Sequence, residues 1–168
     1  MMRAKRTSGR PGFSLIELII VVVIIGIIAA IAIPKMSRGA RNAGGNTLRM
    51  DLSIMRNAIE LYATEHEGKF PDATLMDQLT MYSNLLGDST TAVKTPPSLV
   101  YGPYLKDIPA LPVGSKRGDA TVAFDSTAGS RPSGAGTQGW WYNTADHVLR
   151  ANLASTEVDD DGTAYNTY

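Results

Sequence analysis

The longest apolar stretch of the chain covers residues 13–33 and constrains the fold more than any other feature. It reads FSLIELIIVVVIIGIIAAIAI and is followed by Pro34. As a helix, these 21 residues rise about 31 Å, which matches a bilayer hydrocarbon core of about 30 Å. Lipid obliges the backbone to close its hydrogen bonds internally, which favours a helix even in a sequence rich in valine and isoleucine. We therefore predict a membrane-spanning helix over residues 13–34, with a helix break at Pro34.

A short basic leader precedes this segment. Residues 1–12 carry four basic side chains and no acidic one, whereas three basic side chains follow the segment closely: Lys35, Arg38 and Arg41. The small excess on the leader side predicts a cytoplasmic N-terminus. The alternative is a removed secretory signal, with Ala30-x-Ala32 as its cleavage site. A long apolar stretch that contains Glu17 argues against that alternative, because a signal peptide has no use for a buried acid.

Glu17 is the single charged residue of the apolar segment. A carboxylate at mid-membrane costs roughly 2.5–3.5 kcal/mol on insertion scales, and less near a helix end. The side chain can reach the cytoplasmic headgroups, or it can await a cationic partner. No Lys or Arg lies between Arg10 and Lys35 to serve as that partner. The residues alone leave both readings open.

Residues 12–17, GFSLIE, follow the basic leader and open the unbroken apolar run. This arrangement resembles the class III signal of type IV pilins and type II secretion pseudopilins. The resemblance implies that a prepilin peptidase cleaves between Gly12 and Phe13 and N-methylates Phe13. It also implies that Glu17 pairs with the new Phe13 amine of a neighbouring subunit. Opposite charges attract strongly in a low dielectric, and leaving either of them unpaired there is costly.

The remainder of the chain predicts a small globular domain over residues 47–168. Residues 35–46 are polar and contain glycines, so we expect a neck that is either flexible or a helix able to melt locally. From Thr47 the helical period returns, and we expect this amphipathic helix to stop near Gly68. Its apolar stripe consists of Leu48, Leu52, Met55, Ile59 and Tyr62.

Three segments predict a sheet for this helix to pack on. Residues 120–124 are one strand candidate, and residues 139–143 and 148–152 read as the two arms of a hairpin. The first arm contains the aromatic run 140–142, which we expect to pack the sheet onto the helix rather than to stack on a sugar. The expected fold is α+β and pilin-like. A long N-terminal helix, with a transmembrane half and an amphipathic half, packs on a small antiparallel β-sheet.

The composition argues against an enzyme. The 168 residues include no cysteine, which excludes disulfides, thiol nucleophiles and cysteine-ligated metals. Of the two histidines, we expect His66 at the surface near a helix end and His147 in a loop. Lys plus Arg (16) equals Asp plus Glu (16), and no basic and aromatic pattern outside the leader points to nucleic acid.

An acidic run near the C-terminus suggests one metal. Glu157, Asp159 and Asp161, followed by Gly162, have the spacing of the first half of an EF-hand calcium loop. The twelfth position is Tyr168 rather than the glutamate that such a loop requires. A solvated acidic tail is therefore the expectation, with these three residues as calcium candidates only. No other cofactor is expected.

The resemblance implies a structural subunit of a type II secretion pseudopilus. Such a chain waits in the bacterial inner membrane as a single-pass protein, with a cytoplasmic N-terminus and a periplasmic domain. An assembly platform and ATPase-driven machinery then polymerise it with itself and other pseudopilins into a periplasm-spanning filament that drives protein secretion. The alternatives are a type IV pilus subunit or a minor pseudopilin and, from another class, a membrane-anchored or secreted binding module.

Two further segments resemble the major pseudopilin of type II secretion. They are the Gly68-Lys-Phe-Pro71 turn and the tyrosine- and proline-containing stretch 101–109. The aspartate-proline-tryptophan-glycine sequence that usually continues this stretch is absent, and residues 110–114 (ALPVG) stand there instead. The absence of cysteine also favours a pseudopilin, because major pilins often carry a C-terminal disulfide loop.

Overall fold

The computed structural model of the chain describes residues 13–168, except for the side chains of residues 32–42. Gly12, at the predicted cleavage point, lies outside the described residues. Internal contacts divide the chain into two compact units, residues 1–39 and 40–168. Each unit is described below by itself.

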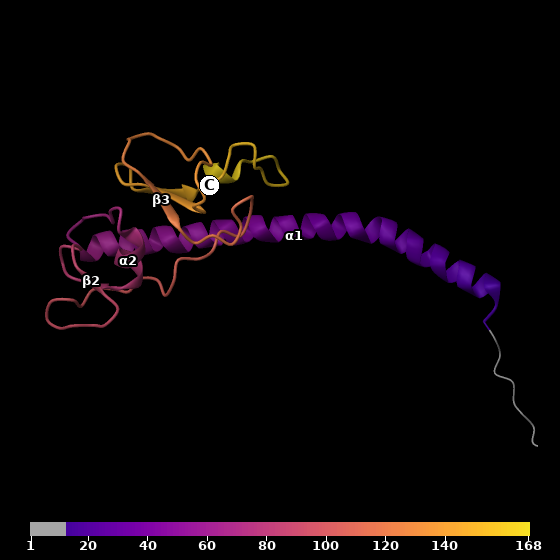
Figure 1. Cartoon of the computed structure of the whole chain (residues 1–168), viewed down its shortest axis with the longest axis horizontal. Coiled ribbons are helices and arrows are strands. Elements are labelled where there is room, and N and C mark those ends of the chain that lie inside the picture. Colours follow the sequence, from indigo (N-terminus) through magenta and orange to yellow (C-terminus); the bar gives the residue numbers. More distant parts are fainter. Residues whose placement is uncertain (1–12) are drawn as a thin grey trace, which may run out of the picture. The chain divides into compact units, whose positions relative to one another are not determined.

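One helix, α1 (Leu15–Glu65), accounts for all of the regular structure in the described residues 13–65 (Figure 1). Its backbone stays helical through Pro34, so the helix break predicted there is wrong. Of the two alternatives for the neck at residues 35–46, the structure has the helical one. A proline removes one backbone hydrogen bond, and each glycine costs about 1 kcal/mol in a helix. In this chain those costs do not end the helix.

The described part of the first unit is the apolar half of α1. Its large apolar side chains are exposed along the whole of residues 13–31, for example Phe13 at 86% and Ile24 at 50%. Among the residues whose side chains are described, no helix is both long and apolar enough to cross a membrane. The span predicted over residues 13–34 extends past those residues and stays a prediction.

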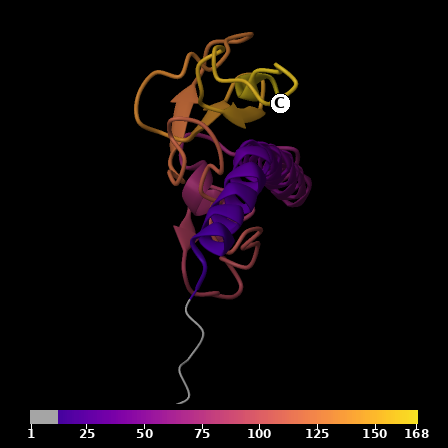
Figure 2. The ribbon, with the colours of Figure 1, turned by 90° about the vertical axis from the view of Figure 1, so that its right-hand side faces the viewer.

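The second unit contains the remaining elements. Strands β1 (Tyr82–Ser83) and β2 (Thr90–Thr91) form an antiparallel pair that follows the short helix α2 (Leu75–Thr80). A three-stranded sheet has the order β3–β4–β5, and the chain closes with the short 3-10 helix η1 (Tyr165–Thr167). Its strands are β3 (Val122–Asp125), β4 (Trp140–Asn143) and β5 (Val148–Ala151). In Figures 1 and 2 this sheet and the β1–β2 pair lie on different sides of the second half of α1.

The predicted α+β class and the predicted hairpin are confirmed. Strands β4 and β5 are antiparallel, with Trp140 opposite Ala151. Strand β3 lies parallel to β4, with Val122 opposite Trp140, so the sheet is mixed rather than wholly antiparallel. The long loop over residues 126–139 makes this possible, because parallel neighbours need a connection of a dozen or more residues.

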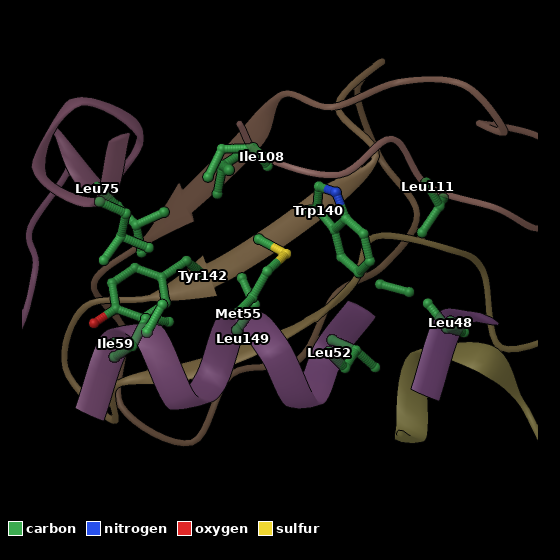
Figure 3. Packing of buried hydrophobic residues seen from close by; sticks show 14 of the residues in the cluster. Leu48, Leu52, Met55, Ile59, Leu75, Ile108, Leu111, Trp140, Tyr142 and Leu149 are labelled. Atoms are coloured by element: carbon green, nitrogen blue, oxygen red, sulfur yellow. The ribbon is translucent and has the colours of Figure 1, made fainter. Parts of the chain in front are cut away.

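The core of the second unit lies between α1 and the three-stranded sheet (Figure 3). Every residue of the predicted stripe is buried, with at most 2% of its surface exposed: Leu48, Leu52, Met55, Ile59 and Tyr62. From the sheet, Trp140 and Tyr142 face them, and both are fully buried. The Trp140 Nε1–H donates a hydrogen bond of 2.7 Å to the Pro109 carbonyl, so burial leaves its one polar atom paired.

Helix α1 ends close to where the sequence predicts. Glu67 and Gly68 both have left-handed backbone conformations, with φ of 56° and 81°. The Gly68 N–H donates to the Ala63 carbonyl at 2.8 Å, which satisfies one of the last carbonyls of the helix. Glycine adopts this conformation without a steric penalty, which explains why the helix stops beside Gly68.

Candidate functional site

The first turn of α1 holds the carboxylate that the sequence singles out. Glu17 Oε2 accepts a hydrogen bond of 2.9 Å from the Ser14 N–H. Ser14 and Glu17 have the spacing of a capping box, in which the third helical residue reaches back to the amide of the capping residue. The carboxylate also lies at the positive end of the helix dipole. The sequence analysis missed this bond, although the Ser-x-x-Glu spacing is the signal that predicts it.

Phe13 directly precedes this turn and is exposed. Because Glu17 is turned back onto Ser14, its carboxylate lies at the end of the helix where cleavage before Phe13 would create a free amine. The structure thus places Phe13 and Glu17 at the same exposed end of α1. The cleavage after Gly12, the methylation and the pairing between subunits stay predictions.

Two of the three calcium candidates in the C-terminal segment, Glu157 and Asp159, are held by different partners. Glu157 Oε1 accepts from the Ser115 N–H at 2.6 Å, and Oε2 accepts from the Ala154 N–H at 3.1 Å. Partial burial raises the pKa of Glu157, but these backbone hydrogen bonds outweigh it and bring the pKa below its ordinary value. This carboxylate therefore connects the C-terminal segment to the loop around residue 115.

Asp159 bonds to another part of the unit. Its Oδ2 forms an ion pair of 3.1 Å with Arg49 Nη2 on α1, and it also accepts a hydrogen bond from the Tyr168 hydroxyl. Its Oδ1 accepts from the backbone N–H groups of Asp161 and Thr163, at 2.9 and 2.8 Å. The hydrogen bond from Tyr168, with the others, holds the pKa of Asp159 below its ordinary value. Asp159 thus attaches the C-terminal segment to α1.

Among the described residues, no group of three or more His, Cys, Asp or Glu side chains could hold a metal ion. Glu157, Asp159 and Asp161 are therefore not brought together as a ligand set. The physical reason is that donors from within the chain already occupy the first two carboxylates.

We expect calcium to leave the stability of the protein unchanged. A ligand that binds only the folded state raises the unfolding temperature, and here the Glu157 and Asp159 carboxylates that calcium would need are already bonded to groups of the chain. Thermal unfolding of the chain in detergent, followed by circular dichroism, should give the same midpoint with millimolar calcium and with excess EDTA. As a control, Arg49→Met should lower the midpoint equally in both. A rise on adding calcium would contradict this assignment of the loop.

The aromatic run on β4 is not available to a ligand. Trp140 and Tyr142 are fully buried, and Trp141 is 6% exposed. The predicted packing role is confirmed, and the sugar-stacking alternative lacks the exposed faces that it needs.

The position predicted for His66 is wrong. The residue is fully buried, and its ring stacks on Tyr62 with centroids 3.8 Å apart. Nδ1 lies 2.8 Å from the Tyr62 carbonyl, and Nε2 lies 2.9 Å from the Ser83 hydroxyl. Because a carbonyl only accepts, Nδ1 is the donor, and Nε2 accepts from Ser83. The signal for burial was the helical period, since His66 lies four residues after Tyr62 on the same stripe.

The comparisons with known proteins find one matching family and relatives of two kinds. Residues 8–33 match the family described as the prokaryotic N-terminal methylation motif. Two proteins named type IV major pilin protein PilE1, both from Neisseria gonorrhoeae, are each 30% identical to this chain over 97 residues. That alignment covers 58% of this chain and 50% and 46% of the two pilins. The chain thus spans about half the length of these relatives.

A third relative covers more of both chains. The type II secretion system core protein G of Aeromonas hydrophila is 28% identical over 115 residues, which are 68% of this chain and 73% of that protein. No solved structure matches the chain significantly. In its methylation motif, in its similarity to both groups of relatives and in its long helix packed on a small sheet, this chain is similar to type IV pilins and to a type II secretion core protein.

Proposed function

We propose that the chain is a structural subunit of a type II secretion pseudopilus. A prepilin peptidase cleaves it after Gly12 and methylates Phe13, and it then polymerises into a helical filament. The observation that carries this proposal is the exposed apolar half of α1, residues 13–31, in which Glu17 is the only charged side chain. A surface of this kind needs either lipid or other copies of itself to cover it.

A membrane and the interior of a filament are both apolar environments that can cover residues 13–31. Before assembly, the segment lies in the inner membrane as a single span, with the N-terminus in the cytoplasm and residues 47–168 in the periplasm. In the filament, the apolar helices pack against one another. The transfer exchanges one apolar environment for another, so its net free energy is small and an ATPase-driven assembly platform can tip the balance. The interface is head-to-tail, so it propagates without closing.

Glu17 sets the axial register in this proposal. The freed Phe13 amine of one subunit pairs with the Glu17 carboxylate of its neighbour, because a charge left alone among apolar helices is costly. The Ser14 bond to Glu17 already directs the carboxylate to the end of the helix where such an amine arrives. Register is therefore specified by one charge pair along an otherwise uniform apolar surface.

Two observations support a pseudopilin over a type IV pilin. The similarity to core protein G covers 73% of that protein, against 50% and 46% of the two gonococcal pilins. The chain also has no cysteine with which to close a C-terminal disulfide loop. Deletion of the gene in the native host separates the two roles: the pseudopilin loses protein secretion, whereas the pilin loses surface pili.

The N-terminus of the protein extracted from native membranes tests the proposal directly. Intact mass and N-terminal sequencing should show a chain that begins at N-methylated Phe13. The matched variant Gly12→Val should retain the leader, because the resemblance places the glycine at the cleavage point. A mature chain that begins near Ile33 would instead mean a removed secretory signal. A chain that keeps Met1 or Met2 would overturn the proposed processing.

A further inference from the structure

A pocket with two carboxylates lies beside the end of α1, within the second unit. Its volume is about 390 Å³. The walls come from the end of α1, the turn over residues 68–72, helix α2, residues 86–88 and the turn between β4 and β5. None of these residues belongs to the N-terminal segment on which the proposed function rests.

Tyr62 supplies an unpaired hydroxyl to this pocket. The residue is 1% exposed and lines the pocket, and no hydrogen bond to its hydroxyl is found among the described residues. The hydroxyl lies against Gly87, where an added Cβ would be 1.8 Å from the oxygen. Because Tyr62 lines the pocket, a ligand there can bond to its hydroxyl directly.

The charges around this hydroxyl are mostly negative. Asp72 and Asp88 line the pocket, and Lys69 is the one Lys or Arg of the lining. Burial raises the pKa of Tyr62 to about 12, and the charges of Asp72 and Asp88 add to the effect. Tyr62 therefore keeps its proton at neutral pH, and the lone pairs of its oxygen remain free to accept a hydrogen bond.

An aromatic wall completes the pocket. The Phe70 and His147 rings stack with centroids 4.1 Å apart and planes 10° from parallel. His147 holds a left-handed backbone conformation in the hairpin turn, with φ of 57°. That conformation is unfavourable for a residue with a side chain, and the stacking on Phe70 offsets part of the cost. The apolar wall suits the methylene stem of a long basic side chain.

We propose that this pocket binds an ammonium or guanidinium group. The Tyr62 oxygen accepts a hydrogen bond from the cation, and the Asp72 and Asp88 carboxylates neutralise its charge. The cation belongs either to a lysine or arginine side chain of a neighbouring protein chain or to a free amine. The carboxylates alone would describe an ordinary polar surface, and it is the hydroxyl of the almost fully buried Tyr62, which has no hydrogen bond to the described residues, that indicates a ligand.

Titration of the full chain with a lysine analogue tests the proposal. We would follow the amide signals of Gly68 and Gly87 by NMR in an uncharged detergent. N-acetyl-lysine methylamide should shift them saturably, with a dissociation constant of about 1–10 mM, as expected for a single charged group. The uncharged N-acetyl-norleucine methylamide has a similar stem and should leave them in place. Equal shifts with both compounds would overturn the proposal.

Three variants locate the binding. Tyr62→Phe and Asp88→Asn should each weaken binding of the lysine analogue at least about threefold, the effect expected from losing one hydrogen bond or one charge. Lys69→Gln should strengthen it, because a competing cation is removed. Unchanged affinity in both Tyr62→Phe and Asp88→Asn would overturn the proposal.

Tyr142→Phe is the matched control. The Tyr142 hydroxyl is buried without a hydrogen-bond partner among the described residues, and Tyr142 does not line this pocket. Tyr142→Phe should unfold at the wild-type temperature or above, because it loses a buried, unsatisfied hydroxyl. Tyr62→Phe should unfold near the wild-type temperature, because the hydroxyl that it loses bonds to no described residue. Only Tyr62→Phe should weaken binding. Equal weakening by the two variants would show that the hydroxyl acts through packing and would overturn its assigned role.

A photo-crosslinking residue at Leu86 distinguishes the two sources of the cation. Leu86 lines the pocket and is 53% exposed. A crosslink in the native host to a peptide with Lys or Arg beside the attachment point supports a side chain as the ligand. Bound amine in the extracted protein, with no crosslinked peptide, supports a free amine. Neither the crosslink nor a bound amine would count against a physiological cation site.

Discussion

Glu17→Ala should abolish or severely reduce incorporation of the chain into filaments while leaving membrane insertion normal. The substitution removes the one charge of the apolar half of α1, so the Phe13 amine of the adjoining subunit would be buried without a partner. Breaking a buried ion pair by removing one member costs about 3–5 kcal/mol, which corresponds to a loss of more than a hundredfold in assembly. Filament yield after shearing, against the amount of subunit in the membrane, measures the effect.

Glu17→Gln separates pairing from helix capping. Glutamine can still accept the hydrogen bond from the Ser14 N–H, because either Glu or Gln serves at this position of a capping box. It cannot neutralise an amine. If pairing is the role of Glu17, Glu17→Gln should fail to assemble as Glu17→Ala does. Wild-type assembly of Glu17→Gln would show that the cap, and not the charge, is what the filament requires.

Leu52→Ala should destabilise the globular domain by about 3–5 kcal/mol. Leu52 belongs to the buried stripe on α1 and is 1% exposed, so its truncation leaves a cavity between the helix and the sheet. The loss is a large fraction of the 5–15 kcal/mol that typically stabilises a domain of this size. Chemical unfolding of the full chain in detergent, followed by tryptophan fluorescence, reports on it through the buried Trp140.

Leu61→Ala is the matched control for that variant. Leu61 is the same residue type on the same helix, but it is 50% exposed. Its truncation opens no cavity, so we expect a change below about 1 kcal/mol. Similar losses from Leu52→Ala and Leu61→Ala would contradict the packing of α1 on the sheet as described.

Local patterns along the chain were sufficient to predict the buried face of α1 and the hairpin of β4 and β5. The stripe from Leu48 to Tyr62 predicted which face of α1 is buried, because a helical period depends only on the spacing of apolar residues. The hairpin of β4 and β5 was predicted for a similar reason, since its two arms and its turn are close in sequence. The GFSLIE run likewise predicted the methylation motif that the family comparison finds.

Two predictions, the helix break at Pro34 and the surface position of His66, were wrong because each applied a local rule that the surrounding structure overrides. Proline usually ends a helix, yet the backbone of α1 continues through Pro34, because the cost of one lost hydrogen bond is finite and the flanking residues remain helical. His66 is charged or polar by type and stands between two glutamates, which suggested the surface. His66 is buried instead, because it lies on the buried stripe and shares a hydrogen bond with Ser83, 17 positions later.

The sequence by itself determined the apolar helix with its single charge, the amphipathic half of α1 and the hairpin, because each depends on neighbours in the chain. Only the tertiary structure decided the parallel pairing of β3 with β4, the bonding of Glu157 to Ser115 and of Asp159 to Arg49, and the pocket around Tyr62. Those features join residues that are distant in sequence, such as Tyr62 and His147. Their contacts depend on which loops close and which polar groups find partners, and no local period encodes that choice.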